Sequence, residues 1–182
     1  YLDSSGNIIW DGSVNAGFGY NVFGVARDDN SALMQTRSSS VNVSPADVLT
    51  LEVESGSLAS NQSYLIVGNN GLAETIKTST LPERTTGMLN KVWLARESLR
   101  DVGTLQLEFD MGASGLSNLD DLELYVADDA SFGNFENFEG TNVGGVLTFT
   151  GINLTDGQHF TLGEPLQITG SSSLFFDGVD DY

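Results

Sequence analysis

Apolar residues recur at every second position through much of this chain, which is the period of a β-strand with one buried face. In residues 48–54 (VLTLEVE), Leu49, Leu51 and Val53 alternate with threonine and glutamate. The same alternation runs through residues 102–109 and 146–150. Successive side chains of a strand point to opposite faces, so these segments require a core on one side and water on the other. The pattern predicts an all-β fold with few or no helices.

Turn signals separate the strand candidates. Asp11-Gly12, Asn70-Gly71 and Asp156-Gly157 punctuate the apolar segments, and the chain has 21 glycines. Many short strands joined by regular turns are typical of two packed sheets. We therefore expect a two-sheet β-sandwich of jelly-roll or immunoglobulin-like topology.

Two segments depart from clean alternation. Residues 64–67 (YLIV) form a continuous apolar run, which indicates a strand covered on both faces. Residues 89–99 fit either helical or strand spacing. We favour a strand because Gly87 and Gly103 bracket the segment and its neighbours are all β.

A chain of 182 residues is long enough for one domain of ordinary size. A Gly/Ser break at residues 170–173 gives the best boundary. Residues 1–170 are predicted to form the sandwich module. Residues 171–182 are either its final strand or the start of a neighbouring domain.

The charge is strongly acidic, with seven Lys and Arg against 25 Asp and Glu, for a net charge of −18. Such a field repels phosphate backbones and anionic lipids, so we expect no nucleic-acid partner. No apolar stretch reaches the ~18–20 residues that span a bilayer, so we expect no membrane insertion. No signal peptide opens the sequence, so export would depend on a signal outside it. The chain has no cysteine, which excludes disulfides, zinc–thiolate sites and a cysteine nucleophile.

Adjacent aspartates occur four times, more often than chance predicts, and three of the pairs follow an apolar strand candidate. Hard cations such as Ca²⁺ take carboxylate ligands from loops of this kind. The predicted Ca²⁺ ligands are Asp28, Asp29, Asp128, Asp129, Asp177, Asp180 and Asp181. Turn chemistry is the alternative for each, because an aspartate side chain bonds nearby backbone N–H groups. Asp28-Asp29 has a further alternative, which is pairing with Arg27 and Arg37.

Enzyme signatures are lacking in the sequence. His159 is the only histidine, and no serine lies in a G-x-S-x-G elbow. The chain is therefore predicted not to be an enzyme. Trp10, Asp11 and Tyr20 are predicted to form a ligand-stacking surface, with core or rim positions as the alternative for the aromatic residues. Residues 132–138 (FGNFENF) are expected to form a flap over the sandwich edge; an exposed contact surface is the alternative.

Six blocks of the chain carry a family resemblance: residues 8–11 (IIWD), 22–33 (VFGVARDDNSAL), 38–42 (SSSVN), 124–129 (LYVADD), 147–152 (LTFTGI) and 156–162 (DGQHFTL). They are similar to an uncharacterised domain family of large secreted bacterial surface proteins and adhesins, often found after laminin-G-like jelly rolls. Residues 174–182 (LFFDGVDDY) separately resemble the opening strand of a laminin-G-like domain. The chain departs from the family at Ala26, at residues 34–37 and at residues 129–131, and the last departure weakens a calcium site in that loop.

The resemblance implies an extracellular module of a long adhesin at the cell surface. Together with the acidic loops it predicts a calcium-stabilised, monomeric module in surface adhesion. The module would space neighbouring domains of the same chain or bind a glycan or peptide on a host or substratum surface. One alternative is a lectin-like domain that contacts carbohydrate through bound calcium. A second alternative is a glycoside hydrolase accessory domain, which would need two carboxylates facing each other in a deep groove.

Overall fold

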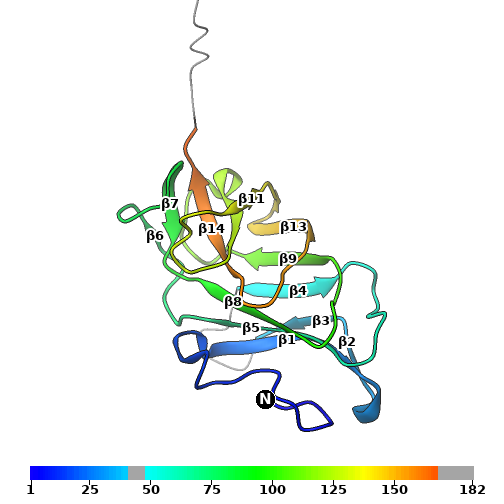
Figure 1. Cartoon of the computed structure of the whole chain (residues 1–182). Coiled ribbons are helices and arrows are strands. Elements are labelled where there is room, and N and C mark those ends of the chain that lie inside the picture. Colours follow the sequence, from blue (N-terminus) through cyan, green and yellow to red (C-terminus); the bar gives the residue numbers. More distant parts are fainter. Residues whose placement is uncertain (41–47, 168–182) are drawn as a thin grey trace, which may run out of the picture.

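The computed structural model describes residues 1–40 and 48–167. In these residues the strands form two antiparallel sheets packed face to face, one of nine strands and one of five (Figure 1). The all-β sandwich predicted from the sequence is confirmed. The helical segments of the described part are short 3-10 turns: η1 (Ala16–Phe18), η2 (Asp29–Ser31) and η3 (Leu119–Asp121).

The larger sheet has the strand order β11-β10-β14-β8-β5-β1-β2, with β7 joined to β14 and β6 joined to β7. Its strands are β1 (Tyr20–Asp28), β2 (Leu33–Gln35), β5 (Ser63–Asn69), β6 (Ile76–Lys77), β7 (Thr85–Leu89), β8 (Trp93–Ser98), β10 (Glu123–Ala127), β11 (Glu136–Phe138) and β14 (His159–Pro165). The smaller sheet has the order β12-β13-β9-β4-β3. Its strands are β3 (Arg37–Ser39), β4 (Leu49–Val53), β9 (Leu105–Asp110), β12 (Thr141–Val143) and β13 (Val146–Ile152).

The main core lies between the two sheets and uses the apolar positions of the alternating segments. β4 and β9 each bury every second residue, and the large sheet contributes Val25, Leu65, Val67 and Trp93 from the opposite side. The Trp93 ring meets Phe109 of the small sheet edge-on, with centroids 5.3 Å apart. Burial of each large apolar side chain contributes about 1.5–3 kcal/mol, so this interface holds the two sheets together.

The ambiguous segment 89–99 contains the end of β7 and the whole of β8, so the strand prediction is confirmed. Trp93 and Ala95 are fully buried in the main core, as expected for residues two apart on one face. No helix in the described residues is long and apolar enough to cross a membrane. Residues 171–182, which were assigned either to a final strand or to a next domain, lie outside the described residues.

The outer faces of the two sheets differ. The small sheet presents polar residues to solvent, and Arg37 on β3 pairs there with Glu52 of β4 and Glu108 of β9. The large sheet is covered at one end by residues 1–19 and at the other by residues 128–135, which we call the flap (Figure 1). This cover explains why residues 64–67 on β5 are apolar without alternation.

Glycines on the large sheet make room for two aromatic rings on its outer face. A Cβ at Gly68 would lie 2.9 Å from the ring of Trp10, and a Cβ at Gly163 would lie 2.1 Å from the ring of Tyr125. Both distances are shorter than van der Waals contact, so a larger residue at either position would displace the ring. The two glycines therefore allow the N-terminal segment and the flap end to pack closely on the sheet.

Candidate functional site

Asp28 is a buried carboxylate at the end of β1, with 2% of its surface exposed. It accepts hydrogen bonds from the Tyr64 hydroxyl at 2.8 Å, from the Ser4 hydroxyl at 2.8 Å, and from the backbone N–H groups of Ser4 and Asn30. The Ser4 hydroxyl contributes most to lowering the pKa of Asp28 from 3.8 to about 2; burial opposes this, and the Tyr64 hydroxyl and the two N–H groups add to it. A carboxylate with four donors is fully satisfied by the protein itself.

The second aspartate of this pair also has protein partners. Asp29 accepts two hydrogen bonds from the Arg27 guanidinium, at 2.8 and 3.1 Å, and the ion pair lies at the surface. The alternative to calcium was that Arg27 and Arg37 pair with this doublet. Arg27 does so, whereas Arg37 pairs with glutamates of the small sheet. The structure thus gives both carboxylates of Asp28-Asp29 partners that need no cation.

A groove of about 560 Å³ lies beside Asp28, between the N-terminal segment and strands β1 and β2. Tyr1, Leu2 and Leu33 form part of its apolar wall. The polar groups at its base, Asp28 and Tyr64, are hydrogen-bonded to each other. The groove therefore has room for a ligand, but its buried polar groups need no additional partner.

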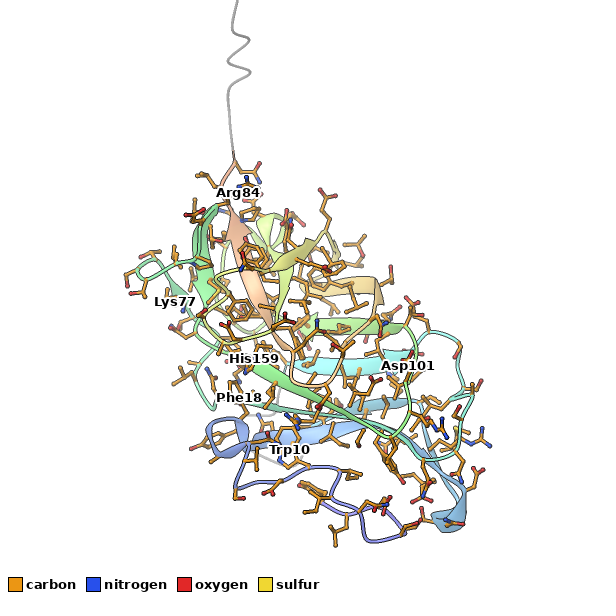
Figure 2. All side chains as sticks on the ribbon, viewed as in Figure 1. Trp10, Phe18, Lys77, Arg84, Asp101 and His159 are labelled. Atoms are coloured by element: carbon orange, nitrogen blue, oxygen red, sulfur yellow. The ribbon has the colours of Figure 1, made fainter. Side chains whose placement is uncertain are left out.

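The Asp128-Asp129 pair opens the flap and is exposed. Asp129 accepts bonds from the backbone N–H and hydroxyl of Ser131, which is turn chemistry, and these bonds lower its pKa. His159 lies nearby and its ring meets Phe18 edge-on at 5.0 Å (Figure 2). Burial lowers the pKa of His159 despite the opposing charge of Asp129.

Among the described residues, the fold keeps the two predicted pairs of metal ligands, Asp28-Asp29 and Asp128-Asp129, apart. β1, which ends at Asp28, and β10, which ends just before Asp128, are separated by β5, β8 and β14, a span of roughly 19 Å at ordinary strand spacing. In residues 1–40 and 48–167, no group of three or more acidic or histidine side chains is arranged to hold a metal ion. Asp177, Asp180 and Asp181 lie outside the described residues.

The residues predicted to form a ligand-stacking surface differ in how far they are exposed to solvent. Trp10 is 3% exposed and packs over Gly68, so its ring faces are covered by protein. Asp11 accepts bonds from the backbone N–H and hydroxyl of Ser13 in a local turn. Tyr20 is 60% exposed and is the residue of this set whose ring is open to a ligand.

A second buried tyrosine, Tyr125, lies at the flap end of the large sheet. Its side chain is fully buried and crosses Gly163 of β14. The hydroxyl of Tyr125 and Oγ1 of Thr85 on β7 are both buried, and among the described residues neither has a hydrogen bond of acceptable length and angle. The two groups are nonetheless close enough for Thr85 to lower the pKa of Tyr125, although burial raises it more. Thr85 is therefore the partner of the Tyr125 hydroxyl, in poorer geometry than the Asp28–Tyr64 hydrogen bond.

The flap covers Tyr125. Phe132 is fully buried against Met88, Val92 and Ala127, and it adopts a left-handed backbone conformation with φ of 54°. Phe135 is half-buried and stacks on the Tyr125 ring with centroids 4.2 Å apart and an interplanar angle of 30°. Phe132 therefore anchors the loop, and Phe135 forms a cover over Tyr125.

A pocket of about 380 Å³ opens beside these rings, and we call it the flap site. Its principal lining residues are Glu83, Arg84, Glu123, Tyr125, Asn134, Phe135 and Asn137. Asn137 donates to Glu123 at 2.6 Å and so fixes that carboxylate at the rim. Arg84 lies at the opposite end of the molecule from Trp10 and the N-terminal segment (Figure 2). The site combines a half-buried aromatic ring with a mostly polar lining of donors and acceptors, which can orient a polar ligand.

The flap site was not among the residues selected from the sequence. The signal was the phenylalanine-rich stretch 132–138, which was expected to be a flap; residues 132–135 do cover the sheet, whereas residues 136–138 form its edge strand β11. Its polar lining could not be inferred, because Arg84, Glu123 and Asn137 meet only through the pairing of β7, β10, β11 and β14.

Residues 1–158 match a family model described as Domain of unknown function (DUF8202). The chain belongs to the DUF8202 family. No curated protein and no solved structure matches it. The matched region contains the Asp28 network and most of the flap site of this DUF8202 domain, including Tyr125 and Phe135.

Proposed function

We propose that this DUF8202 domain is a non-catalytic, extracellular binding module of a bacterial adhesin, and that it holds its ligand at the flap site. The observation that carries the binding role is the pocket of about 380 Å³ at the flap, which is lined by an aromatic ring, an arginine and asparagines. The adhesin setting is supported by the sequence resemblance described above.

The pocket residues are held by the strand pairing of the large sheet. Tyr125, Glu123 and Asn137 lie on paired strands, so the pocket is largely formed before a ligand arrives. Preformed pockets of this size bind small ligands or the ends of larger ones. A glycan end or a short peptide fits this description, as the sequence analysis expected.

Calcium stabilisation stays part of the proposal, supported by the net charge of −18 and the exposed Asp128-Asp129 pair. Within the described residues Asp28 and Asp29 are bonded to protein groups, so they contribute less to this part of the proposal than Asp128 and Asp129. An exposed doublet at the start of the flap would link the ion to the pocket cover.

Glycan and peptide arrays, each run with and without calcium, test the proposed function. We expect the wild-type chain to bind at least one arrayed ligand and Phe135→Ala to reduce that signal. Tyr20→Ala, which alters an exposed ring at the other end of the large sheet, is the matched control and should bind as the wild type does. Binding that is lost in Tyr20→Ala and retained in Phe135→Ala would assign recognition to the surface predicted from the sequence.

A further inference from the structure

We infer that the large sheet carries a second ligand pocket, at its N-terminal end, and that this pocket takes the side chain of a lysine from a peptide partner. The pocket lies between residues 8–15 and the end of β8, and we call it the N-terminal pocket. It shares no lining residue with the flap site, so the inference goes beyond the proposed function and does not depend on it.

Two buried polar side chains without partners line this pocket. Trp93 and Ala95 of β8 face the main core, so Ser98 lies on the outer face of the sheet, beneath the N-terminal segment. The Ser98 Oγ is buried and has no hydrogen-bond partner among the described residues. Asn15 is 5% exposed, and its side chain makes no hydrogen bond in residues 1–40 and 48–167. Buried polar groups are almost always hydrogen-bonded, so these two are available to a molecule in the pocket.

The N-terminal segment gives the pocket an apolar wall, formed by Ile8, Ile9, Trp10 and Val14. Ile8 is 62% exposed and Val14 is 71% exposed, so the pocket opens to solvent at this wall. Its volume of about 210 Å³ is smaller than the ~300–1,000 Å³ of pockets that enclose drug-sized ligands. The space therefore suits one side chain that has an apolar stem and a polar end.

The charges around the pocket favour a cationic end. Arg96 is paired with Asp156, with Nε 3.1 Å from Oδ1, which leaves Asp11 and Glu97 as the other charged groups of the lining. Oδ1 of Asp11 accepts the bonds from Ser13, whereas its Oδ2 accepts none from the described residues. The chain as a whole carries −18, so a cation is also attracted from a distance.

Glu97 would gain most from a cation beside it. Burial raises the pKa of its carboxyl; the N–H of Val102 opposes this, and the charge of Asp101 adds to it. An opposite charge at close range favours the ionised form of a buried carboxyl. A bound ammonium group would therefore offset the cost of keeping Glu97 charged.

Lysine combines the required features. Its ammonium has three donors and no acceptor, so it can meet the amide oxygen of Asn15, the Ser98 Oγ and a carboxylate oxygen together. Its four-carbon stem can lie on the apolar wall at Ile9 and Trp10 while the charged end reaches the polar groups. A neutral sugar lacks the charge, and an anionic ligand would enter against the carboxylates.

Three variants separate the pocket from the overall charge. Ser98→Ala removes the unpartnered hydroxyl. Glu97→Gln removes a charge but keeps an oxygen for the N–H of Val102. Glu139→Gln is the matched control, because it removes the same charge from an exposed position that lines neither pocket.

The experiment is an NMR titration of the isotope-labelled full chain with the peptide acetyl-Gly-Lys-Gly-amide, its norleucine counterpart, pentylamine and a neutral oligosaccharide. We expect the lysine peptide to shift the Asn15 side-chain amide and the Trp10 indole resonances in a saturable way. The norleucine peptide has an apolar stem without the charge and should bind about tenfold more weakly or not at all. The affinity for the lysine peptide should fall about tenfold in Ser98→Ala and in Glu97→Gln and stay unchanged in Glu139→Gln.

Each alternative result contradicts a defined part of the inference. Equal binding of the norleucine peptide would overturn the role of the charge, and an unchanged affinity in Ser98→Ala and Glu97→Gln would overturn the pocket. A response to pentylamine or to the sugar in place of the lysine peptide would overturn the ligand class. No response to any probe would mean that the pocket holds only water, which would overturn the inference. The arrays with Phe135→Ala report on the flap site, so either proposal can fail without the other.

Discussion

The two ends of the large sheet's outer face each bury a tyrosine, but they use its hydroxyl differently. At the N-terminal end, the Tyr64 hydroxyl donates a hydrogen bond to Asp28, which also accepts hydrogen bonds from Ser4 and Asn30. At the flap end, Tyr125 and Thr85 are buried side by side without a bond of acceptable geometry. The hydrogen bonds of the Asp28 network are sufficient to explain why its polar residues are buried. A buried pair of hydroxyls in poor hydrogen-bond geometry lowers the stability of the fold unless another interaction compensates. The difference predicts that removing the Tyr64 hydroxyl costs more stability than removing the Tyr125 hydroxyl.

The largest expected effect comes from detaching the flap. Phe132→Ala should destabilise the domain by about 3–5 kcal/mol, because it empties a fully buried aromatic position. Urea unfolding measures this change, and Tyr20→Ala, which alters an exposed ring, should stay within ~0.5 kcal/mol of the wild type. A loss no larger than that control would mean that the flap is not anchored by Phe132.

The next effect tests the N-terminal end. Asp28→Ala leaves the Tyr64 hydroxyl, the Ser4 hydroxyl and two N–H groups without an acceptor, so Tm should fall by roughly 5–10 °C. Asp29→Ala breaks only a surface ion pair and should lower Tm far less. Equal losses in the two variants would contradict the structural role assigned to Asp28.

Calcium provides a separate test of the flap end. If an ion binds only the folded chain, calcium at 100 times its Kd adds about 2.7 kcal/mol. We expect melting in millimolar calcium to give a higher Tm than melting in EDTA, with a smaller difference in an Asp128→Asn, Asp129→Asn double variant. An unchanged midpoint in the wild type would remove calcium from the proposal.

Acid should weaken the Asp28 network within a defined pH window. The pKa of Asp28 is about 2 in the folded chain and 3.8 ordinarily, so its contribution is complete above pH 3.8 and is lost as pH falls towards 2. The Tm difference between wild type and Asp28→Asn should therefore be constant above about pH 4.5 and shrink steadily below it. A difference that persists unchanged to pH 2 would show that the charge on Asp28 is not what stabilises this end.

The sequence alone predicted the part of the fold that alternation controls. Apolar and polar residues alternate in 48–54 and 102–109 because one face of the small sheet is exposed to solvent. The continuous apolar run at 64–67 reflects a strand that is covered on both faces. The phenylalanine-rich stretch likewise indicated the flap. These features depend on local spacing, which the sequence displays directly.

The site residues were harder to predict because their partners are distant in the sequence. Asp28 suggests a metal ligand when read alone, and the Tyr64 hydroxyl that bonds it is 36 residues away. Trp10 suggests a stacking surface, but Gly68 allows it to pack on β5. Tyr125 gives no signal at all, because its place beside Thr85 depends on how β7 and β10 lie on either side of β14.

Equilibrium unfolding of Tyr64→Phe and Tyr125→Phe, measured side by side in urea without ligand, tests the contrast between the two ends most directly. Tyr64→Phe should lose about 1–2 kcal/mol, because Asp28 loses a donor inside a buried network. Tyr125→Phe should lose less than this, because the hydroxyl that it deletes meets Thr85 in poor hydrogen-bond geometry. A loss in Tyr125→Phe equal to that in Tyr64→Phe would show that the two hydroxyls are equally well bonded within the fold, and would contradict the difference between the two ends.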